Sequence, residues 1–157
     1  MNEKKAFQDL VSAASPRRHC YGCGADNVRG LNIKSYWDGD EAVCRWTPQP
    51  FHSSGPSDSL NGGVAATLID CHSVYTAVAT AYKLEGRQIG EGNDIDYATA
   101  KLTVTYLKRT PMDTTLELRS KVVKKGNRSI VVETVLRAHG EECVRGEVVA
   151  VRVGPAT

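Results

Sequence analysis

The chain has 157 residues, of which 41% are hydrophobic, which is enough for one domain with a substantial core. Twenty basic and eighteen acidic residues leave a formal charge of +2, and this argues against nucleic-acid binding, which needs a concentrated basic face. No uncharged apolar run reaches the ~20 residues of a membrane span, and the N-terminus lacks the apolar stretch of a signal peptide. We therefore expect a single domain over residues 1–157, located in the cytoplasm and not in a membrane.

Two short elements are predicted in the N-terminal part of the chain, a helix and a β-hairpin. Residues 3–13 have Phe7, Leu10 and Val11 at helical spacing and predict a short amphipathic helix. We expect residues 1–25 to be a peripheral segment. Residues 31–37 and 41–46 flank an Asp-Gly pair that suits a tight turn, so they predict a β-hairpin.

A long loop and a long helix follow. Residues 47–63 are rich in proline, glycine and serine and predict a loop of roughly fourteen residues, a length that suggests a function. Residues 63–83 are apolar on nearly every side of a helix that would span about 30 Å. This apolar helix nevertheless carries Asp70 near its centre.

The C-terminal half consists of four segments with polar and β-branched residues at period two: 96–109, 114–125, 129–139 and 142–153. Short turns separate them, so we expect four antiparallel strands that are neighbours in the sheet. An apolar helix must be covered, and the available surface is the concave face of this sheet. The predicted fold class is therefore α+β, with about six antiparallel strands around one long central helix.

Two motifs carry a resemblance to a known family. The stretch NGGVAATLID is similar to a His-Gly-Gly motif that opens a central helix and leads to an acid, with Asn61 in place of the histidine. The Cys-Gly-x-x-Asn-x-x-Gly-Leu stretch from Cys23 to Leu31, and a strand ending in tyrosine before basic residues and Pro111, are also similar. The chain thus resembles the hotdog-fold acyl-CoA thioesterases, especially their phenylacetate-pathway-like branch. The resemblance implies a hotdog fold, hydrolysis of an acyl-CoA thioester without a cofactor, and a homodimer or dimer of dimers with shared sites.

The start of the helix is a candidate oxyanion site. Helix N-termini present free N–H groups and partial positive charge, and glycines allow a carbonyl oxygen to approach the backbone closely. Gly62 and Gly63 are therefore candidate donors to the thioester oxygen, and Asn61 stands beside them. On the alternative interpretation, Asn-Gly-Gly only caps the helix, since asparagine is a favoured N-cap residue.

Asp70 is the candidate catalytic carboxylate. It could attack the thioester carbonyl directly or activate a water molecule, with the thiolate of coenzyme A as the leaving group. Gly63 lies seven residues away, about 10 Å along a helix, so both cannot reach one carbonyl within a single chain. Two chains with antiparallel helices would bring Asp70 of one to Gly63 of the other. The alternative is an aspartate that pairs with a basic residue for structural reasons.

Two further residues are secondary candidates. The resemblance places Thr99 where some relatives have a hydroxyl that steadies the attacking water, although an ordinary strand threonine is equally compatible with the pattern. His72 could move a proton near neutral pH, but residues i and i+2 do not share a helix face, so an Asp70–His72 pair is not expected. A hydrogen-bonded core histidine is the more common case.

A charged turn is the candidate site for the phosphates of coenzyme A. It contains Lys124, Lys125, Asn127 and Arg128, and clustered cations with turn amides favour polyanions. Basic turns are also commonly only solvated.

Cys20 and Cys23 form a CxxC motif, which is half of a zinc site. Cys44 or His19 would have to complete it. Five cysteines without dense spacing are typical of free thiols in a reducing compartment, so we expect no metal. Any zinc here would be structural, because nothing in the sequence links this motif to Asp70.

Two other functions compete with hydrolysis. The chain could bind acyl-CoA without turnover if Asn61 has blunted the chemistry. A hotdog dehydratase ranks last, because it would need a histidine and an acid around a β-hydroxyacyl chain, and Asn61 lies where the thioesterase histidine would be.

Overall fold

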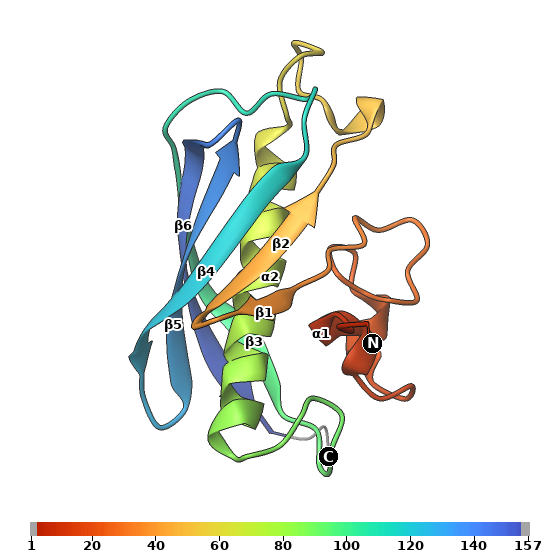
Figure 1. The fold of residues 1–157 in the computed structure, drawn as a ribbon, viewed down its shortest axis with the longest axis vertical. Helices are drawn as coiled ribbons and strands as arrows, with labels where there is room; N and C mark the ends of the chain where they lie inside the picture. The colour runs from red at the N-terminus through yellow and green to blue at the C-terminus, as the bar shows by residue number, and fades with distance from the viewer. Residues whose placement is uncertain (1–2, 155–157) are drawn as a thin grey trace.

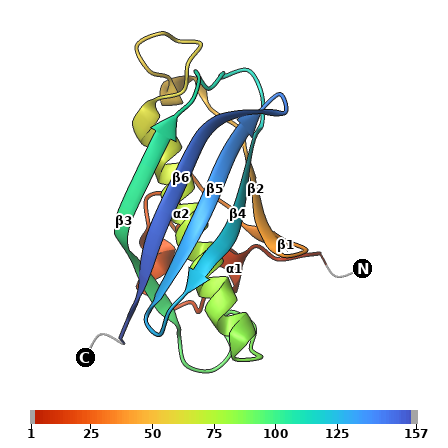
Figure 2. The same ribbon diagram turned by 90° about the vertical axis from the view of Figure 1, so that its left-hand side faces the viewer.

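The computed structural model describes residues 3–154, which form one layer of sheet and one long helix. The sheet has six antiparallel strands, and the 23-residue helix α2 (Gly62–Leu84) packs along one of its faces (Figures 1 and 2). The predicted hotdog architecture, an antiparallel sheet around one central helix, is confirmed. Helix α2 begins one residue before the predicted start and ends one residue after the predicted end.

The remaining elements are short before α2 and long after it. They are α1 (Phe7–Leu10), η1 (Pro16–His19), β1 (Tyr36–Asp38), β2 (Glu41–Trp46), η2 (Pro50–His52), β3 (Asp96–Tyr106), β4 (Leu116–Lys125), β5 (Ser129–Ala138) and β6 (Glu141–Val153).

The strand order is β1-β2-β4-β5-β6-β3. The prediction that all four C-terminal strands are neighbours in sequence order is wrong for β3 and β4, because β3 pairs with β6 at the opposite edge from β1 (Figure 2). The connection over residues 107–115 is not a tight turn. It is tied to the loop before α2, where the Leu60 N–H donates to the Thr110 carbonyl at 2.9 Å, and this carries the chain to β4 beside β2.

Helix α2 is apolar on most sides because it is covered on both faces. Its residues from His72 to Tyr82 are buried without a break. On the sheet side Gly146 of β6 lies so close to Ile69 that a Cβ added to the glycine would be 2.3 Å from Ile69 Cγ2. The helix therefore contacts the sheet backbone itself at this point. No helix in residues 3–154 is long and apolar enough to cross a bilayer.

The N-terminal segment covers the face of α2 that points away from the sheet (Figure 1). Part of this segment belongs to the core, since Phe7 is 4% exposed and Gln8 1%. Only four residues are helical, because the backbone is extended at Ala6 and Val11 on either side. The buried Gln8 Oε1 accepts from the Ser35 N–H at 2.8 Å. The predicted strand over residues 31–37 is also shorter. The N–H groups of Leu31 and Ile33 donate to the carbonyls of Tyr21 and Gly22 in this segment instead of to the sheet.

Candidate active site

Asp70 lies in the middle of α2 on the side next to β3, where the sheet does not cover it completely. Its Oδ1 accepts a hydrogen bond from Thr99 Oγ1 at 2.6 Å, and its Oδ2 has no hydrogen-bond partner among residues 3–154. Partial burial raises the pKa of Asp70, and the hydrogen bond from Thr99 opposes this rise. One carboxylate oxygen is therefore held in place while the other is free to meet a ligand.

A cavity of about 180 Å³ opens beside this carboxylate. Its walls come from three parts of the chain: the N-terminal segment, α2 and the first half of β3. The lining residues are Arg17, Cys20, Cys23, Asp70, Cys71, Val74, Tyr75, Tyr97, Ala98 and Thr99. The Arg17 guanidinium holds these parts together, since it lies 5.3 Å from the centre of the Tyr75 ring and pairs with Asp96 at the start of β3.

At the start of α2, Asn61 is the N-cap. Its Oδ1 accepts from the N–H groups of Gly63 at 2.8 Å and Val64 at 3.1 Å. The sequence left two interpretations of the Asn-Gly-Gly motif open, helix capping and oxyanion binding. In the structure the Gly63 N–H is used for capping. The Gly62 N–H has no partner among the described residues. Asn61 Nδ2 likewise donates no hydrogen bond within residues 3–154, so two donors remain at this helix end.

Tyr106 is a residue near this helix end that sequence reasoning did not single out. It ends β3, and its hydroxyl donates to the Gly62 carbonyl at 2.6 Å. Its side chain is largely exposed, so this contact lies on the surface between β3 and α2. The available signal was the tyrosine that precedes basic residues and Pro111 in the strand motif.

Asp70 and the start of α2 lie on the same exposed strip between α2 and β3. Asp70 contacts Thr99 near the beginning of β3, and Gly62 contacts Tyr106 at its end. Gly62 and Asp70 are eight residues apart, which is about 12 Å along an α-helix. Within one chain the carboxylate and the free amide donors therefore cannot act on the same carbonyl.

His72 is not part of this strip. It is fully buried, with Nδ1 at 2.7 Å from Ser35 Oγ and Nε2 at 3.1 Å from the Ala42 carbonyl. Burial lowers the pKa of His72 to about 4, so the ring is neutral and occupied by structural hydrogen bonds. His72 is therefore a structural residue of the core, and its ring does not reach the cavity at Asp70.

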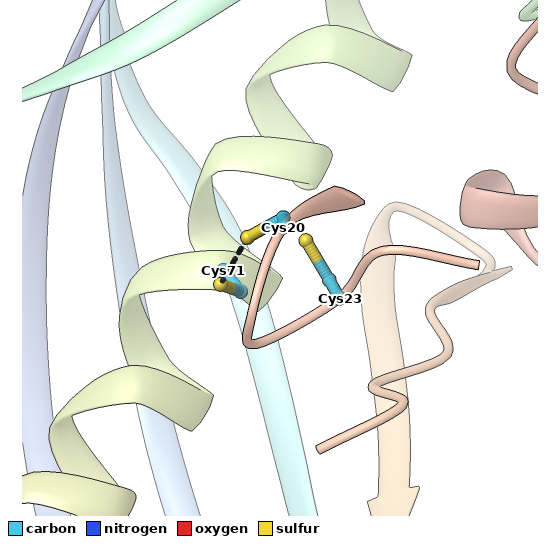
Figure 3. A group of neighbouring side chains, drawn as sticks. All are labelled: Cys20, Cys23 and Cys71. Carbon is cyan, nitrogen blue, oxygen red and sulfur yellow. Dashed lines mark hydrogen bonds between the residues drawn. The ribbon is translucent and has the colours of Figure 1, made fainter. Parts of the chain in front are cut away.

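The CxxC motif has a third cysteine beside it, and that residue is Cys71 of α2. The sulfurs of Cys20 and Cys71 are 3.8 Å apart. In Figure 3 a dashed line joins them, and Cys23 lies next to them. Cys44 and His19, one of which a metal site would have needed on the sequence interpretation, lie elsewhere: Cys44 is buried in the core and His19 is exposed. The expectation that this motif is unrelated to Asp70 is also wrong, because both line the same cavity.

The candidate residues for coenzyme A phosphates lie on the hairpin between β4 and β5. Lys124, Lys125, Asn127 and Arg128 are all exposed. This hairpin is at the opposite end of the molecule from the start of α2 (Figures 1 and 2), and none of the four residues lines the cavity at Asp70. Their role stays a prediction.

Comparison with known proteins gives a family. The sequence model of the thioesterase superfamily matches residues 58–144, and no curated protein matches the chain. A thioesterase superfamily protein from Shewanella loihica is 34% identical, with a TM-score of 0.66 over 94% of this chain and 100% of that one.

Two more distant structures share the fold. The E. coli PaaI protein from the phenylacetic acid degradation operon is 18% identical, with a TM-score of 0.63 over 79% of this chain and 81% of that one. A hypothetical thioesterase from Streptococcus pneumoniae, solved with coenzyme A, is also 18% identical, with a TM-score of 0.63 over 78% and 87%. Because the family match spans more than half of the sequence and the Shewanella match nearly all of it, the chain belongs to the thioesterase superfamily.

Proposed function

We propose that the protein is a homodimeric acyl-CoA thioesterase in which Asp70 attacks or activates water at the thioester. The observation that carries this proposal is the Asp70 carboxylate, which Thr99 holds at the wall of a small cavity with one oxygen free. Membership of the superfamily supports thioester hydrolysis in general. Coenzyme A in the Streptococcus pneumoniae relative supports a CoA thioester as the substrate class.

The dimer is supported by the edge strand β3. Its residues 98–103 are all exposed, and its outer edge has no neighbouring strand among residues 3–154. A long exposed edge strand is a site for pairing with another strand. If two copies of β3 pair antiparallel about an axis between residues 102 and 103, residue 99 of one lies opposite residue 106 of the other.

That pairing joins the two halves of the site. Thr99 contacts Asp70, and Tyr106 contacts Gly62, so a pairing that sets residue 99 opposite residue 106 of the partner also brings Asp70 towards the start of the partner's α2. Asp70 of one protomer would then face the Gly62 N–H and Asn61 Nδ2 of its partner. Each dimer would contain two such sites.

Both routes to hydrolysis use the same groups. As nucleophile, the carboxylate forms a mixed anhydride while the C–S bond breaks and CoA thiolate leaves; water then cleaves the anhydride and restores Asp70. As general base, Asp70 takes a proton from water as the water oxygen bonds to the carbonyl carbon. The C–S bond then breaks, and the sulfur of coenzyme A takes up that proton. In both routes the carbonyl oxygen becomes negative, and the partner's two donors stabilise it.

The test is Asp70→Asn, assayed with short-chain, long-chain and aromatic acyl-CoAs by loss of the thioester absorbance. The amide is neither a nucleophile nor a base, so we expect kcat to fall by about 10²- to 10⁴-fold, the usual contribution of a positioned acid or base. The dimer and the circular dichroism spectrum should be unchanged.

Asp40→Asn is the matched control, because Asp40 is an exposed aspartate in the turn between β1 and β2. It should hydrolyse the same substrates at the wild-type rate. Unchanged kcat in Asp70→Asn would remove Asp70 from the mechanism.

Acyl-CoA binding without turnover is the second candidate function. It is favoured by Asn61, which stands in place of the family's histidine and uses its side-chain oxygen to cap the helix. Saturable binding of an acyl-CoA by wild type, with no loss of the thioester for any member of the panel, would support this function over hydrolysis.

A further inference from the structure

Three cysteines converge between the N-terminal segment and α2. The sulfurs of Cys20, Cys23 and Cys71 all lie within 4.8 Å of one another, and Cys20 Sγ is 3.8 Å from Cys71 Sγ (Figure 3). In a tetrahedral zinc site with Zn–S bonds of about 2.3 Å, the sulfurs are about 3.8 Å apart. The spacing of this cluster is therefore close to that of zinc ligands.

The backbone of the CxxC loop is pressed against the helix at this point. A Cβ added to Gly22 would lie 2.3 Å from Cys71 Sγ and 2.9 Å from Thr67 Cγ2, so only glycine allows the loop to approach so closely. The loop is also closed on itself, since the Gly24 N–H donates to the Cys20 carbonyl at 2.8 Å. Two rigid pieces of chain, fifty-one positions apart, thus hold the sulfurs together.

We propose that Cys20, Cys23 and Cys71 bind one zinc ion through three thiolates. Three Zn–S bonds form, and the thiol protons are released to solvent; no oxidant is needed. The fourth position opens to the cavity that contains Asp70 and takes water. The ion joins the N-terminal segment to α2. This proposal replaces the expectation of a metal-free CxxC motif and is independent of the proposed thioesterase activity.

A disulfide is the competing use of these sulfurs. It would consume two of the three, and it needs an oxidant that the zinc site does not. Gly22 packs closely on Cys71 Sγ and Thr67. This packing places Cys71 against the loop that carries Cys20 and Cys23, as a site that uses all three sulfurs requires.

The test measures metal in the full-length protein purified without chelator. We expect about one zinc ion per chain, released when a mercurial reagent titrates the thiols. After zinc removal, Co²⁺ should give the intense thiolate-to-cobalt charge-transfer bands of a tetrahedral sulfur-rich site. Cys20→Ser, Cys23→Ser and Cys71→Ser should each weaken zinc binding by at least about 100-fold, the upper end of the cost of losing an outer-shell partner.

Two variants make the test selective. Cys143→Ser changes another buried cysteine, outside the cluster, and should keep the zinc. Asp70→Asn should also keep it, because the proposed ligands are the three thiolates alone; loss of zinc in that variant would overturn this ligand set. Circular dichroism of each serine variant separates loss of zinc from loss of fold.

The proposal is overturned if wild type retains no zinc and metal-free wild type gives no charge-transfer band with Co²⁺. It is equally overturned if mass spectrometry of the freshly isolated protein finds two of the three cysteines joined in a disulfide. Neither result bears on acyl-CoA hydrolysis, so failure of the zinc site and failure of the thioesterase proposal are distinguishable.

Discussion

At the scale of single residues, Asn61 caps α2 through its amide oxygen and, in the proposed site, would act on the substrate through its amide nitrogen. The oxygen is bonded to the N–H groups of Gly63 and Val64, and this fixes the amide so that Nδ2 points away from the helix amides. The oxygen stabilises the helix, and the nitrogen is free to donate to a substrate. A substitution that keeps the oxygen and removes the nitrogen can therefore separate stability from catalysis.

Asn61→Asp is that substitution. Asparagine and aspartate are comparable N-caps, so the free energy of unfolding should change by less than about 0.5 kcal/mol in urea titrations. Loss of one oxyanion donor should lower kcat by about 10²- to 10³-fold in the acyl-CoA assay. Asn61→Ala, by comparison, should lose the cap as well and about 1 kcal/mol of stability. Full activity in Asn61→Asp would exclude Nδ2 as a donor.

At the scale of elements, the critical contact is between α2 and β6. Most sheet positions under the helix carry side chains, but Gly146 lets Ile69 reach the strand backbone. This close approach sets how deeply α2 sits on the sheet. The depth in turn sets where Asp70 lies relative to Thr99 on the neighbouring strand β3.

Gly146→Ala should therefore strain this contact. The new methyl would overlap Ile69, and overpacking of this kind costs about 1–3 kcal/mol of unfolding free energy. Urea unfolding measures the loss. Gly55→Ala is the matched control, because a Cβ there meets no atom within 4 Å, and it should leave stability unchanged. Equal stability of the two variants would show that α2 does not depend on this close approach.

At the scale of the whole molecule, one chain contains both halves of the proposed site but separates them. Asp70 lies where α2 meets the beginning of β3, and Gly62 lies where it meets the end. The antiparallel pairing of two β3 strands would reverse this order in the partner. The proposed site then belongs to the dimer, and inactive chains should be able to complement one another.

Co-expression of Asp70→Asn with Asn61→Asp tests this arrangement. Random pairing makes half of the dimers mixed, and each mixed dimer has one wild-type site, so we expect about a quarter of wild-type activity. Each variant expressed alone should remain nearly inactive. Analytical ultracentrifugation should show dimers throughout. Activity of the mixture no greater than the average of the two variants would place the whole site in one chain.

Local patterns in the sequence determined the elements and the main candidate residue. The segments with period-two alternation predicted β3 to β6, and the long apolar run predicted α2 with Asp70 near its centre. Both patterns depend only on which residues share a face of a strand or helix. The motif around Asn61 and the glycines led to the superfamily. These features are properties of neighbouring residues and can be read without knowledge of the fold.

The tertiary structure decided what meets across the chain. That β3 pairs with β6, that Cys71 joins Cys20 and Cys23, and that His72 is held by Ser35 and Ala42 all depend on contacts between distant segments. The burial of Phe7 and Gln8 comes from packing between distant segments, and the hydrophobic periodicity of the sequence does not predict it. Long-range pairing follows from how the whole core closes, and the sequence pattern of any one element does not contain it.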